Sequence, residues 1–256
     1  MNCWQIGLTV FIAFSLAGAQ INRNDEVLQI STIDALLGGI YDGEVNIGQL
    51  LKFGDFGLGT FNSLDGEMVV LDGVSYQVRA DGKVLRVNSS LKTPFAAVTF
   101  FESDTSIVCK DTLNLELLEK KIDSLIVSVN YLYAIKISGH FISATARSVP
   151  AQKPPYRPLS EITSKQQTFT FNNMRGTLVG FRCPPYVKGL NVSGYHLHLL
   201  NESRNAGGHL LSMKADSLII EIDRSDSYRI LLPHDKEFSY ADLTRDKEEE
   251  LRKVER

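Results

Sequence analysis

The chain has little excess charge, little cysteine and no long hydrophobic run beyond its first residues, and each shortage excludes a class of protein. Its 27 Lys and Arg residues against 30 Asp and Glu residues give a formal net charge of −3, so it lacks the positive charge that binding to nucleic-acid phosphates requires. The 8 prolines and 19 glycines follow no repeat, which excludes collagen-like and low-complexity chains. The remaining composition, 43% hydrophobic and 22% charged over 256 residues, is that of a folded protein that can bury a substantial core.

The first nineteen residues carry no charged side chain. Ile6–Leu16 is an apolar run that ends in the small residues Ala17, Gly18 and Ala19, and the sequence then turns abruptly polar. This pattern predicts a signal peptide over residues 1–19, although Lys and Arg are missing before the run. The alternative is a buried N-terminal strand or helix. Because the run is shorter than the roughly 20 apolar residues of a membrane span, we expect the mature chain, residues 20–256, to be secreted or periplasmic and free of the membrane.

The chain has three cysteines, too few for a disulfide framework. Cys3 would leave with the signal peptide. Cys109 and Cys183 would then form one bridge or remain two separate buried thiols, and the sequence does not decide between these. Glycosylation sequons begin at Asn88, Asn191 and Asn201, and they matter only in a host with an endoplasmic reticulum.

Hydrophobic periodicity predicts an α+β fold rich in β-structure, with two packed lobes of mixed or antiparallel strands. The lobes cover about 20–149 and 159–256, and the proline-rich segment 150–158 connects them because it cannot form a helix or a central strand. We expect helices at Thr32–Leu37, Ile47–Lys52 and Leu115–Val129, and a charged C-terminal tail. The predicted strands are Val27–Ile30, Glu67–Leu71, Val74–Arg79, Ala97–Phe101, Tyr133–Ser138, Phe141–Arg147, Thr168–Phe171, Thr177–Phe181, Tyr195–Leu199, His209–Met213 and Leu218–Ile222.

A glycine-rich segment, Gly54–Gly59, does not have the spacing of a nucleotide-binding loop. We expect it to form a tight loop that brings the backbone close to another group. Thr60 follows directly, and its hydroxyl either lines a pocket or closes an ordinary turn.

Three of the five histidines fall in one short segment. His196 and His198 are two residues apart on a predicted strand, so their side chains project from the same face. We expect Gly207 and Gly208 to let the chain turn back, which would place His209 on the neighbouring strand. Three neutral imidazoles on one face suit a Zn²⁺ ion with an open position for water or substrate. The alternative is a set of surface or core histidines that never meet.

Two further alternatives concern the kind of metal site. The sequence from His196 to Glu202 resembles the first half of a cupin motif, in which the glutamate is also a ligand and Fe²⁺ is preferred. A secreted binding module with structural zinc would instead need a fourth protein ligand, either Glu202 or a cysteine.

Several longer segments resemble the acetolactate decarboxylase family along nearly the whole mature chain. They are Ile30–Leu37, Gly54–Phe61, Leu64–Glu67, Tyr133–Gly139, Arg147–Pro150, Gly194–His198, Gly207–His209 and Val254–Glu255. The resemblance implies an enzyme that converts (S)-2-acetolactate to (R)-acetoin and CO₂ with Zn²⁺ on His196, His198 and His209. It also implies catalytic roles for Glu67, Arg147 and Glu255. Two departures are a serine at position 193, where the family leads us to expect proline, and a chain that stops one residue after Glu255.

The chemistry of this reaction agrees with the residue types. Loss of CO₂ from a 2-hydroxy-3-keto acid leaves an electron pair that must delocalise into the ketone as an enediolate, which a metal ion stabilises as a Lewis acid. Arg147 has a planar fork suited to holding an oxygen anion but is a poor proton donor. Glu67 or Glu255, with a raised pKa, is the better proton source. We expect no organic cofactor, a small-molecule substrate and a chain compatible with a homodimer.

Residue types alone also permit simpler roles. Glu67 could be an exposed acid after a hairpin turn, and Arg147 could be a structural ion-pair residue. The tail from Asp242 onward is either a solvated charged helix, with Glu248–Glu250 on its outer face, or a segment that folds back over the metal and brings Glu255 to it.

Overall fold

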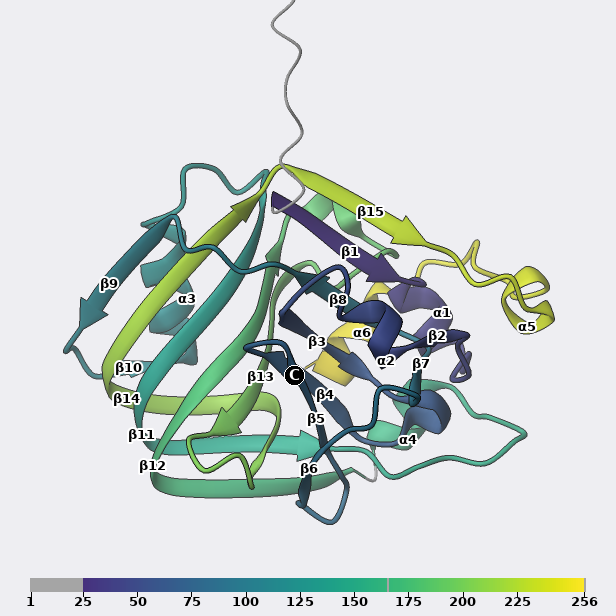
Figure 1. The fold of residues 1–256 in the computed structure, drawn as a ribbon, viewed down its shortest axis with the longest axis horizontal. Helices are drawn as coiled ribbons and strands as arrows, with labels where there is room; N and C mark the ends of the chain where they lie inside the picture. The colour runs from purple at the N-terminus through teal and green to yellow at the C-terminus, as the bar shows by residue number, and fades with distance from the viewer. Residues whose placement is uncertain (1–24, 165, 256) are drawn as a thin grey trace, which may run out of the picture.

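Two β-sheets pack face to face in the computed structural model, which describes residues 25–164 and 166–255 (Figure 1). The predicted signal peptide, residues 1–19, lies outside the described residues. Strands dominate and helices are short, so the predicted β-rich α+β fold is confirmed. Among the described residues, no helix is both long and apolar enough to cross a membrane.

The first sheet has seven strands and contains most of the N-terminal half of the chain. Its strands pair antiparallel except for one parallel pair at the edge, β1 with β15. In spatial order they are β15 (Ser227–Leu231), β1 (Glu26–Ile30), β8 (Ala96–Thr99), β3 (Phe56–Thr60), β4 (Glu67–Leu71), β5 (Val74–Val78) and β6 (Val84–Arg86).

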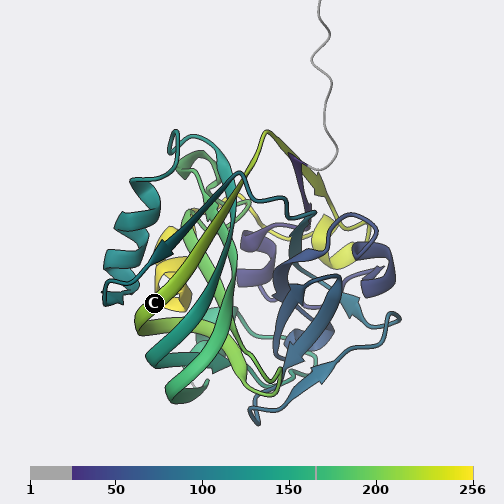
Figure 2. The same ribbon diagram turned by 60° about the vertical axis from the view of Figure 1, so that its left-hand side comes forward.

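The second sheet has six strands, several of them very long, and it curls strongly (Figure 2). Its strands are β9 (Thr105–Cys109), β10 (Leu113–Asn114), β14 (Gly207–Ser225), β11 (Leu132–Ser148), β12 (Gln167–Cys183) and β13 (Gly194–Asn201). The order β14-β11-β12-β13 closes on itself because β13 also pairs with β14, over three residue pairs from His198–His209 to Leu200–Gly207. We call this short ladder the seam.

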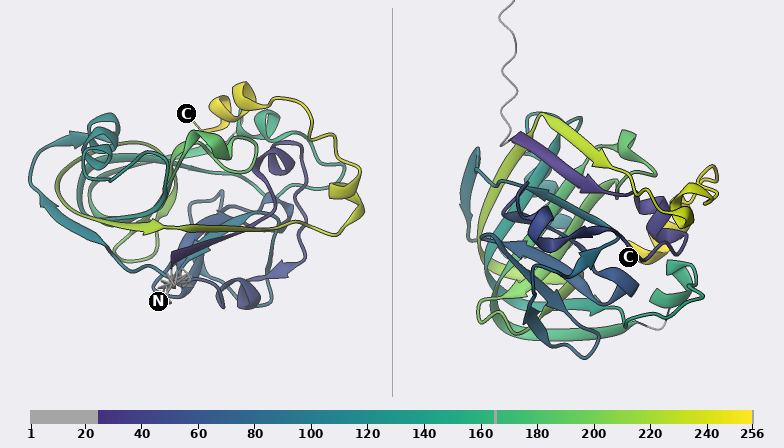
Figure 3. Two further views of the ribbon diagram at one scale, coloured as in Figure 1. Left: turned by 90° about the horizontal axis from the view of Figure 1, so that it is seen from above. Right: turned by 45° about the vertical axis from the view of Figure 1, so that its right-hand side comes forward.

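The helices and remaining strands surround the two sheets. They are α1 (Ile33–Leu37), α2 (Ile47–Leu50), α3 (Leu115–Asp123), α4 (Leu159–Thr163), α5 (Lys236–Ser239), α6 (Glu248–Glu255), the 3₁₀ turns η2 (Asn62–Leu64) and η3 (Pro185–Val187), and the pair β2 (Val45–Asn46) and β7 (Lys92–Thr93). Figure 3 shows α6 beside α4. Leu251 and Val254 of α6 pack in one apolar cluster with α1 and α4, so the tail folds back onto the protein.

The sheets do not coincide with the lobes 20–149 and 159–256 expected from the sequence. β11 precedes the connector 150–158 but lies in the six-stranded sheet, and β15 follows it but pairs with β1. Periodicity locates strands without specifying their partners, and here the partners come from opposite ends of the chain. The connector itself contains no helix or strand.

Two local expectations are wrong. The segment predicted as a glycine loop contains the strand β3 instead, although the close backbone approach expected there is confirmed, because a Cβ at Gly57 or Gly59 would lie 2.1 or 2.4 Å from a carbonyl oxygen of the neighbouring segment. Helix α3 ends at Asp123 rather than Val129. Asn114 caps its start, and after its end Leu125 and Ile126 pack against the core, whereas Val127 and Val129 are exposed.

The main core between the sheets is apolar and fixes their relative position. Phe56, Leu58 and Val69 of the first sheet meet Val179 and Phe181 of the second. Because side chains alternate along β4, Val69 and Leu71 face the second sheet, and Glu67 shares that face. The first residue of β4 is thereby aimed at the strands that carry the histidines.

Candidate active site

The three histidines meet at the seam. His196 and His198 lie on β13 and His209 lies on β14, directly opposite His198. Their ring centroids are 5.0 to 5.4 Å apart, and one nitrogen from each ring lies within 4.8 Å of the other two. The predicted constellation therefore forms in space.

The route by which His209 reaches its partners differs from the expectation. Gly207 and Gly208 do not form the turn, which lies between Asn201 and Ala206, but belong to β14. A Cβ at Gly207 would lie 2.2 Å from the carbonyl oxygen of Leu199. The glycines are needed because the two strands approach closely at the seam.

Hydrogen bonding leaves unpaired ring nitrogens at the centre of this group. Nδ1 of His198 donates to the carbonyl oxygen of Met68 at 2.8 Å, which leaves the lone pair on Nε2. That Nε2, and Nδ1 of His196, are buried without a hydrogen-bond partner in the described part of the chain. Buried polar atoms are normally paired, so these unpaired nitrogens, in a group whose ligand atoms lie within 4.8 Å of one another, fit the binding of a metal ion.

The charge state of the rings also suits a metal. Burial lowers the pKa of His196 to about 3, with the nearby Arg147 guanidinium adding to the effect. Burial also holds the pKa values of His198 and His209 well below the ordinary range. Neutral imidazoles are the form that binds Zn²⁺. The donor set therefore fits a three-histidine site, in which zinc keeps an open position.

Arg147 stands in the same row of the sheet as two of the ligands. It is on β11 directly opposite His209, and only 4% of it is exposed. Its Nη1 lies 3.3 Å from Oε1 of Glu67, and its Nη2 donates to the carbonyl oxygen of Val254 at 2.9 Å. Nε is buried without a partner among the described residues. One guanidinium thus joins three elements and keeps an unused donor.

Two carboxyl groups flank the histidines. Oε2 of Glu67 lies 3.6 Å from Nε2 of His198, and Oε2 of Glu255 lies 3.6 Å from Nε2 of His209 and 3.9 Å from Nε2 of His196. Burial raises the pKa of each carboxyl to about 7, although Arg147 works in the opposite direction. The alternative of an exposed acid at position 67 is therefore excluded, and the C-terminal tail does bring its glutamate to the histidines.

A small cavity of about 30 Å³ remains among these groups. Apolar residues line much of it, namely Ile33, Leu36, Leu64, Phe95, Val149, Leu159 and Val254. Thr60 also lines it, while its hydroxyl donates to the carbonyl oxygen of Gly66 at 2.7 Å. Both expectations for Thr60 therefore hold together: it is part of the wall, and it closes the turn before Glu67.

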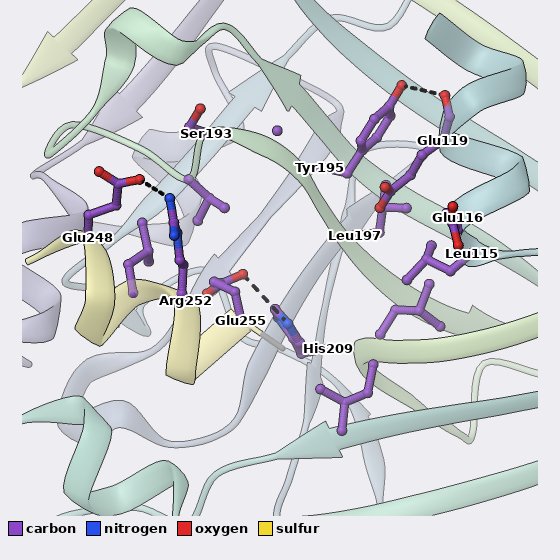
Figure 4. A pocket seen from close by; sticks show the side chains of 15 residues that line it. Leu115, Glu116, Glu119, Ser193, Tyr195, Leu197, His209, Glu248, Arg252 and Glu255 are labelled. Atoms are coloured by element: carbon purple, nitrogen blue, oxygen red, sulfur yellow. Dashed lines mark hydrogen bonds and ion pairs between the residues drawn. The ribbon is translucent and has the colours of Figure 1, made fainter.

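A much larger cleft of about 900 Å³ lies beside the site (Figure 4). It runs between α3, β13 and α6, and its walls include Leu115, Tyr195 and Leu251. His209 and Glu255 line both the cleft and the small cavity. Glu255 therefore stands at the boundary between the histidines and the open space.

The candidate fourth ligands lie elsewhere. Glu202 is exposed and pairs with Arg175 at 3.6 Å. Cys109 and Cys183 are free and buried in two different apolar clusters, so they do not form a bridge. None of the three belongs to the histidine group. The ligands that the cupin and structural-zinc alternatives named, Glu202 or a cysteine, therefore do not lie at the site within residues 25–164 and 166–255.

Sequence reasoning missed the backbone partners of the site. The carbonyl oxygens of Met68 and Val254 orient His198 and Arg147, but a carbonyl leaves no signal in the residue type. The apolar wall was also missed, because residues such as Phe95 and Leu36 are indistinguishable from ordinary core residues until their neighbours are known.

Comparison with known proteins agrees with this geometry. The sequence model of the family "Alpha-acetolactate decarboxylase" matches residues 27–245. The chain is 45% identical to the alpha-acetolactate decarboxylase of Methanosarcina mazei over 92% of this chain and 82% of that one. It is 40% identical to the Bacillus subtilis protein of the same name over 85% and 86%.

Solved structures show the same likeness. The crystal structure of alpha-acetolactate decarboxylase from Bacillus subtilis strain 168 superposes with a TM-score of 0.88 at 38% identity, covering 90% of this chain and 99% of that one. A Staphylococcus aureus protein described as similar to alpha-acetolactate decarboxylase superposes with a TM-score of 0.86 at 29% identity. The chain belongs to the alpha-acetolactate decarboxylase family and is a decarboxylating enzyme, a carboxy-lyase.

Proposed function

We propose that the protein converts (S)-2-acetolactate to (R)-acetoin and CO₂ with a zinc ion held by His196, His198 and His209. One observation carries the proposal: three neutral, buried imidazoles converge beside two carboxyl groups of raised pKa and a buried guanidinium. Family membership supports the substrate, and the set of three nitrogen ligands supports zinc with an open position.

When bound, the zinc supplies a Lewis acid for the ketone and hydroxyl oxygens of the substrate. The residues of the chain supply the rest. Arg147 holds Glu67 and the tail in place through its two Nη atoms and offers its unpaired Nε–H to a substrate oxygen. A planar guanidinium does this without reorganising during the reaction, because its donors are fixed in one plane.

The proton for the new C–H bond comes from Glu255 in this proposal. Breaking the bond to CO₂ leaves an electron pair on the substrate, which takes up one proton. Both carboxyls have a pKa raised to about 7, so contact and access distinguish them: Glu67 is held by Arg147 at 3.3 Å and does not line the cleft. Glu255 lines the cleft and has no arginine in direct contact in the described part of the chain, so its Oε2 can hold a proton and regain it from solvent. Burial behind α6 keeps water away from the reacting atoms.

The test combines metal analysis with product analysis. Purified protein should contain about one zinc per chain and form acetoin from racemic acetolactate, mainly as one enantiomer. The His196→Ala/His198→Ala double variant should lose both the metal and the activity. Glu202→Gln is the matched control and should keep both. Zinc retained by the double variant would contradict the ligand assignment, and metal loss in the control would favour a cupin-type site.

The proposed export of the mature chain, residues 20–256, rests on the sequence pattern of residues 1–19 alone. Cell fractionation with mass spectrometry of the mature N-terminus tests it. A chain that begins at Gln20 outside the cytoplasm is the expected result, and an intact Met1 terminus inside the cell would overturn it.

A further inference from the structure

The cavity beside the histidines is too small for the proposed substrate. Its volume of about 30 Å³ matches the share of one water molecule in the liquid, roughly 30 Å³. A branched five-carbon acid is several times larger. The cleft of about 900 Å³ has ample room, and Glu255 stands between the two spaces. Glu255 is carried by α6, so movement of α6 would join the cavity to the cleft.

Helix α6 is attached by side chains rather than by strand pairing. Near its end, Val254 is buried against α1 and α4, and the Val254 carbonyl oxygen accepts from Arg147. Leu251 is partly buried in the same cluster. The opposite side of the helix faces the cleft. Segments held in this way, with few buried contacts, open at lower free-energy cost than the strands of a sheet.

The start of α6 is fastened by one lysine from another part of the chain. Nζ of Lys188 lies 2.8 Å from Oδ2 of Asp246 and 2.8 Å from Oε2 of Glu248. These two hydrogen bonds raise the pKa of Lys188 to about 12. Nearby, Nζ of Lys247 donates to the carbonyl oxygen of Asp34 at 3.3 Å. Lys188 comes directly after η3, in the loop that leads into β13.

This loop connects the lysine to the metal ligands as well as to the tail. The residues that follow Lys188 enter β13, which carries His196 and His198. Backbone hydrogen bonds from Ile33 and Asp34 to the carbonyl oxygens of Leu190 and Gly189 hold the loop against α1. The backbone of Lys188 therefore leads into β13, which carries two of the histidines, while its side chain pairs with acidic residues at the start of α6.

We propose that α6 is a lid that opens toward the cleft to admit substrate, and that Lys188 is the positioning residue that holds it, and with it Glu255, closed over the histidines. The inference rests on the proposed function, because it takes Glu255 to be the group that must be positioned. Lys188 itself does not touch the site.

The exposure of these side chains sets the strength of the two ion pairs formed by Lys188. The side chains of Lys188, Asp246 and Glu248 are 49%, 65% and 41% exposed, and exposed ion pairs are weak and screened by salt. Loss of both pairs should increase the open population by about fivefold. Ion pairs of this strength favour the closed position of α6 but still allow it to open.

Hydrogen exchange of the tail tests the lid directly. Peptides covering 242–255 should exchange about fivefold faster in Lys188→Ala than in the wild type, both with zinc bound and after its removal. Lys188→Arg should restore slow exchange. Lys83→Ala is the matched control, because Lys83 is an exposed lysine that pairs with Asp81 at 3.6 Å far from the tail, and it should change nothing.

Kinetics supply the second readout. Lys188→Ala should lower kcat by about fivefold with little change in KM or zinc content, because a helix released at its start holds Glu255 less precisely over the histidines even while the lid is closed, and a displacement of about 1 Å can cost up to 10²-fold in rate. The wild-type and Lys83→Ala proteins should lose turnover between low salt and about 0.5 M NaCl, whereas Lys188→Ala should respond much less. The Asp246→Asn/Glu248→Gln double variant removes the same contacts from the other side, together with the Arg252–Glu248 pair inside α6, and should speed exchange and lower kcat at least as much.

The outcomes separate this inference from the proposed function. Unchanged tail exchange in both Lys188→Ala and the double variant would overturn the lid, whatever the activity. Faster exchange with no loss of kcat would show that Lys188 holds the tail without positioning Glu255, and would overturn its role. Faster exchange in a protein that forms no acetoin from acetolactate would support the lid and reject the proposed function instead.

Discussion

Replacing Arg147 by lysine tests whether the planar guanidinium is needed at the centre of the site. Arg147 uses one Nη atom for Glu67 and the other for the carbonyl oxygen of Val254. A lysine keeps the positive charge but places it on one compact ammonium group at the end of a flexible chain. It can reach one of the two acceptors well, and the other loses its donor.

The expected loss follows from the value of one hydrogen bond to a charged group, about 1.5 to 3 kcal/mol. Since about 1.4 kcal/mol corresponds to a factor of ten in rate, Arg147→Lys should lower kcat/KM by roughly 10- to 100-fold. Arg147→Ala is less informative, because leaving Glu67 buried without its partner would cost about 3 to 5 kcal/mol of folding stability. The lysine variant should still bind zinc, because all three ligands remain.

The assay measures acetoin formation at several substrate concentrations, with zinc content and thermal unfolding on the same samples. Arg182→Lys is a matched control: Arg182 is also buried, donates to the carbonyl oxygen of Val129 at 2.6 Å and lies 3.4 Å from Asp123. It should lose stability without a comparable loss of turnover. Wild-type turnover in Arg147→Lys, or an equal loss in Arg182→Lys, would refute the reasoning.

Three further predictions concern other parts of the protein. His198 has a folded-state pKa far below its unfolded value of about 6.5, so its stabilising contribution is complete above pH 6.5 and is lost as the pH falls. His196 and His209 are shifted in the same direction, so in zinc-free protein His198→Gln should reduce the loss of unfolding free energy below pH ~5.5 by about 1.4 kcal/mol per pH unit, measured by urea unfolding. Glu255→Gln should keep zinc but lower kcat by roughly 10²- to 10⁴-fold, and unchanged turnover would exclude it as the proton donor. When the protein is expressed through a eukaryotic secretory pathway, it should carry a glycan at Asn88, which is exposed. It should carry none at Asn191, whose side-chain amide is buried and donates to Gln29. Glycopeptide mass spectrometry measures both sites, and a glycan at Asn191 but not at Asn88 would contradict the prediction.

The alternation of apolar and polar residues located the strands that bury one face, but it divided each of the longest strands into two shorter predicted ones. β11, β12 and β14 each contain two of the predicted strands. Each pair of predicted strands is separated by a short gap, and the polar residues His140, Asn173 and Asp216 lie in these gaps. In the structure His140 contacts both Asp216 and Asn173 through its ring nitrogens, and β11 passes through register shifts at this point. In the sequence, polar residues of this kind resemble those of turns, and only the strand pairing shows that they contact one another across three strands.

The three histidines were predictable from residue type and spacing, whereas Glu67, Arg147 and Glu255 were indicated only by the resemblance to the family. Strand periodicity correctly placed His196 and His198 on one face. The position of His209 directly opposite His198 follows from the register of the β13–β14 hairpin, in which Gly207 permits the close approach of the two strands. The position of Arg147 directly opposite His209 depends on the pairing of β11 with β14, which lie far apart in the sequence, and no local pattern encodes that register.

The seam between β13 and β14 bears on when, during folding, the three histidines would take up a metal ion. His198 and His209 are joined by the short turn between Asn201 and Ala206, so this hairpin is a local structure and forms fast. The pairing of β14 with β11 joins segments far apart in sequence and is slower to form. A metal ion would therefore find all three histidines together before β11 brings Arg147 beside them, and the hairpin rather than the closed sheet would set the time of metal uptake.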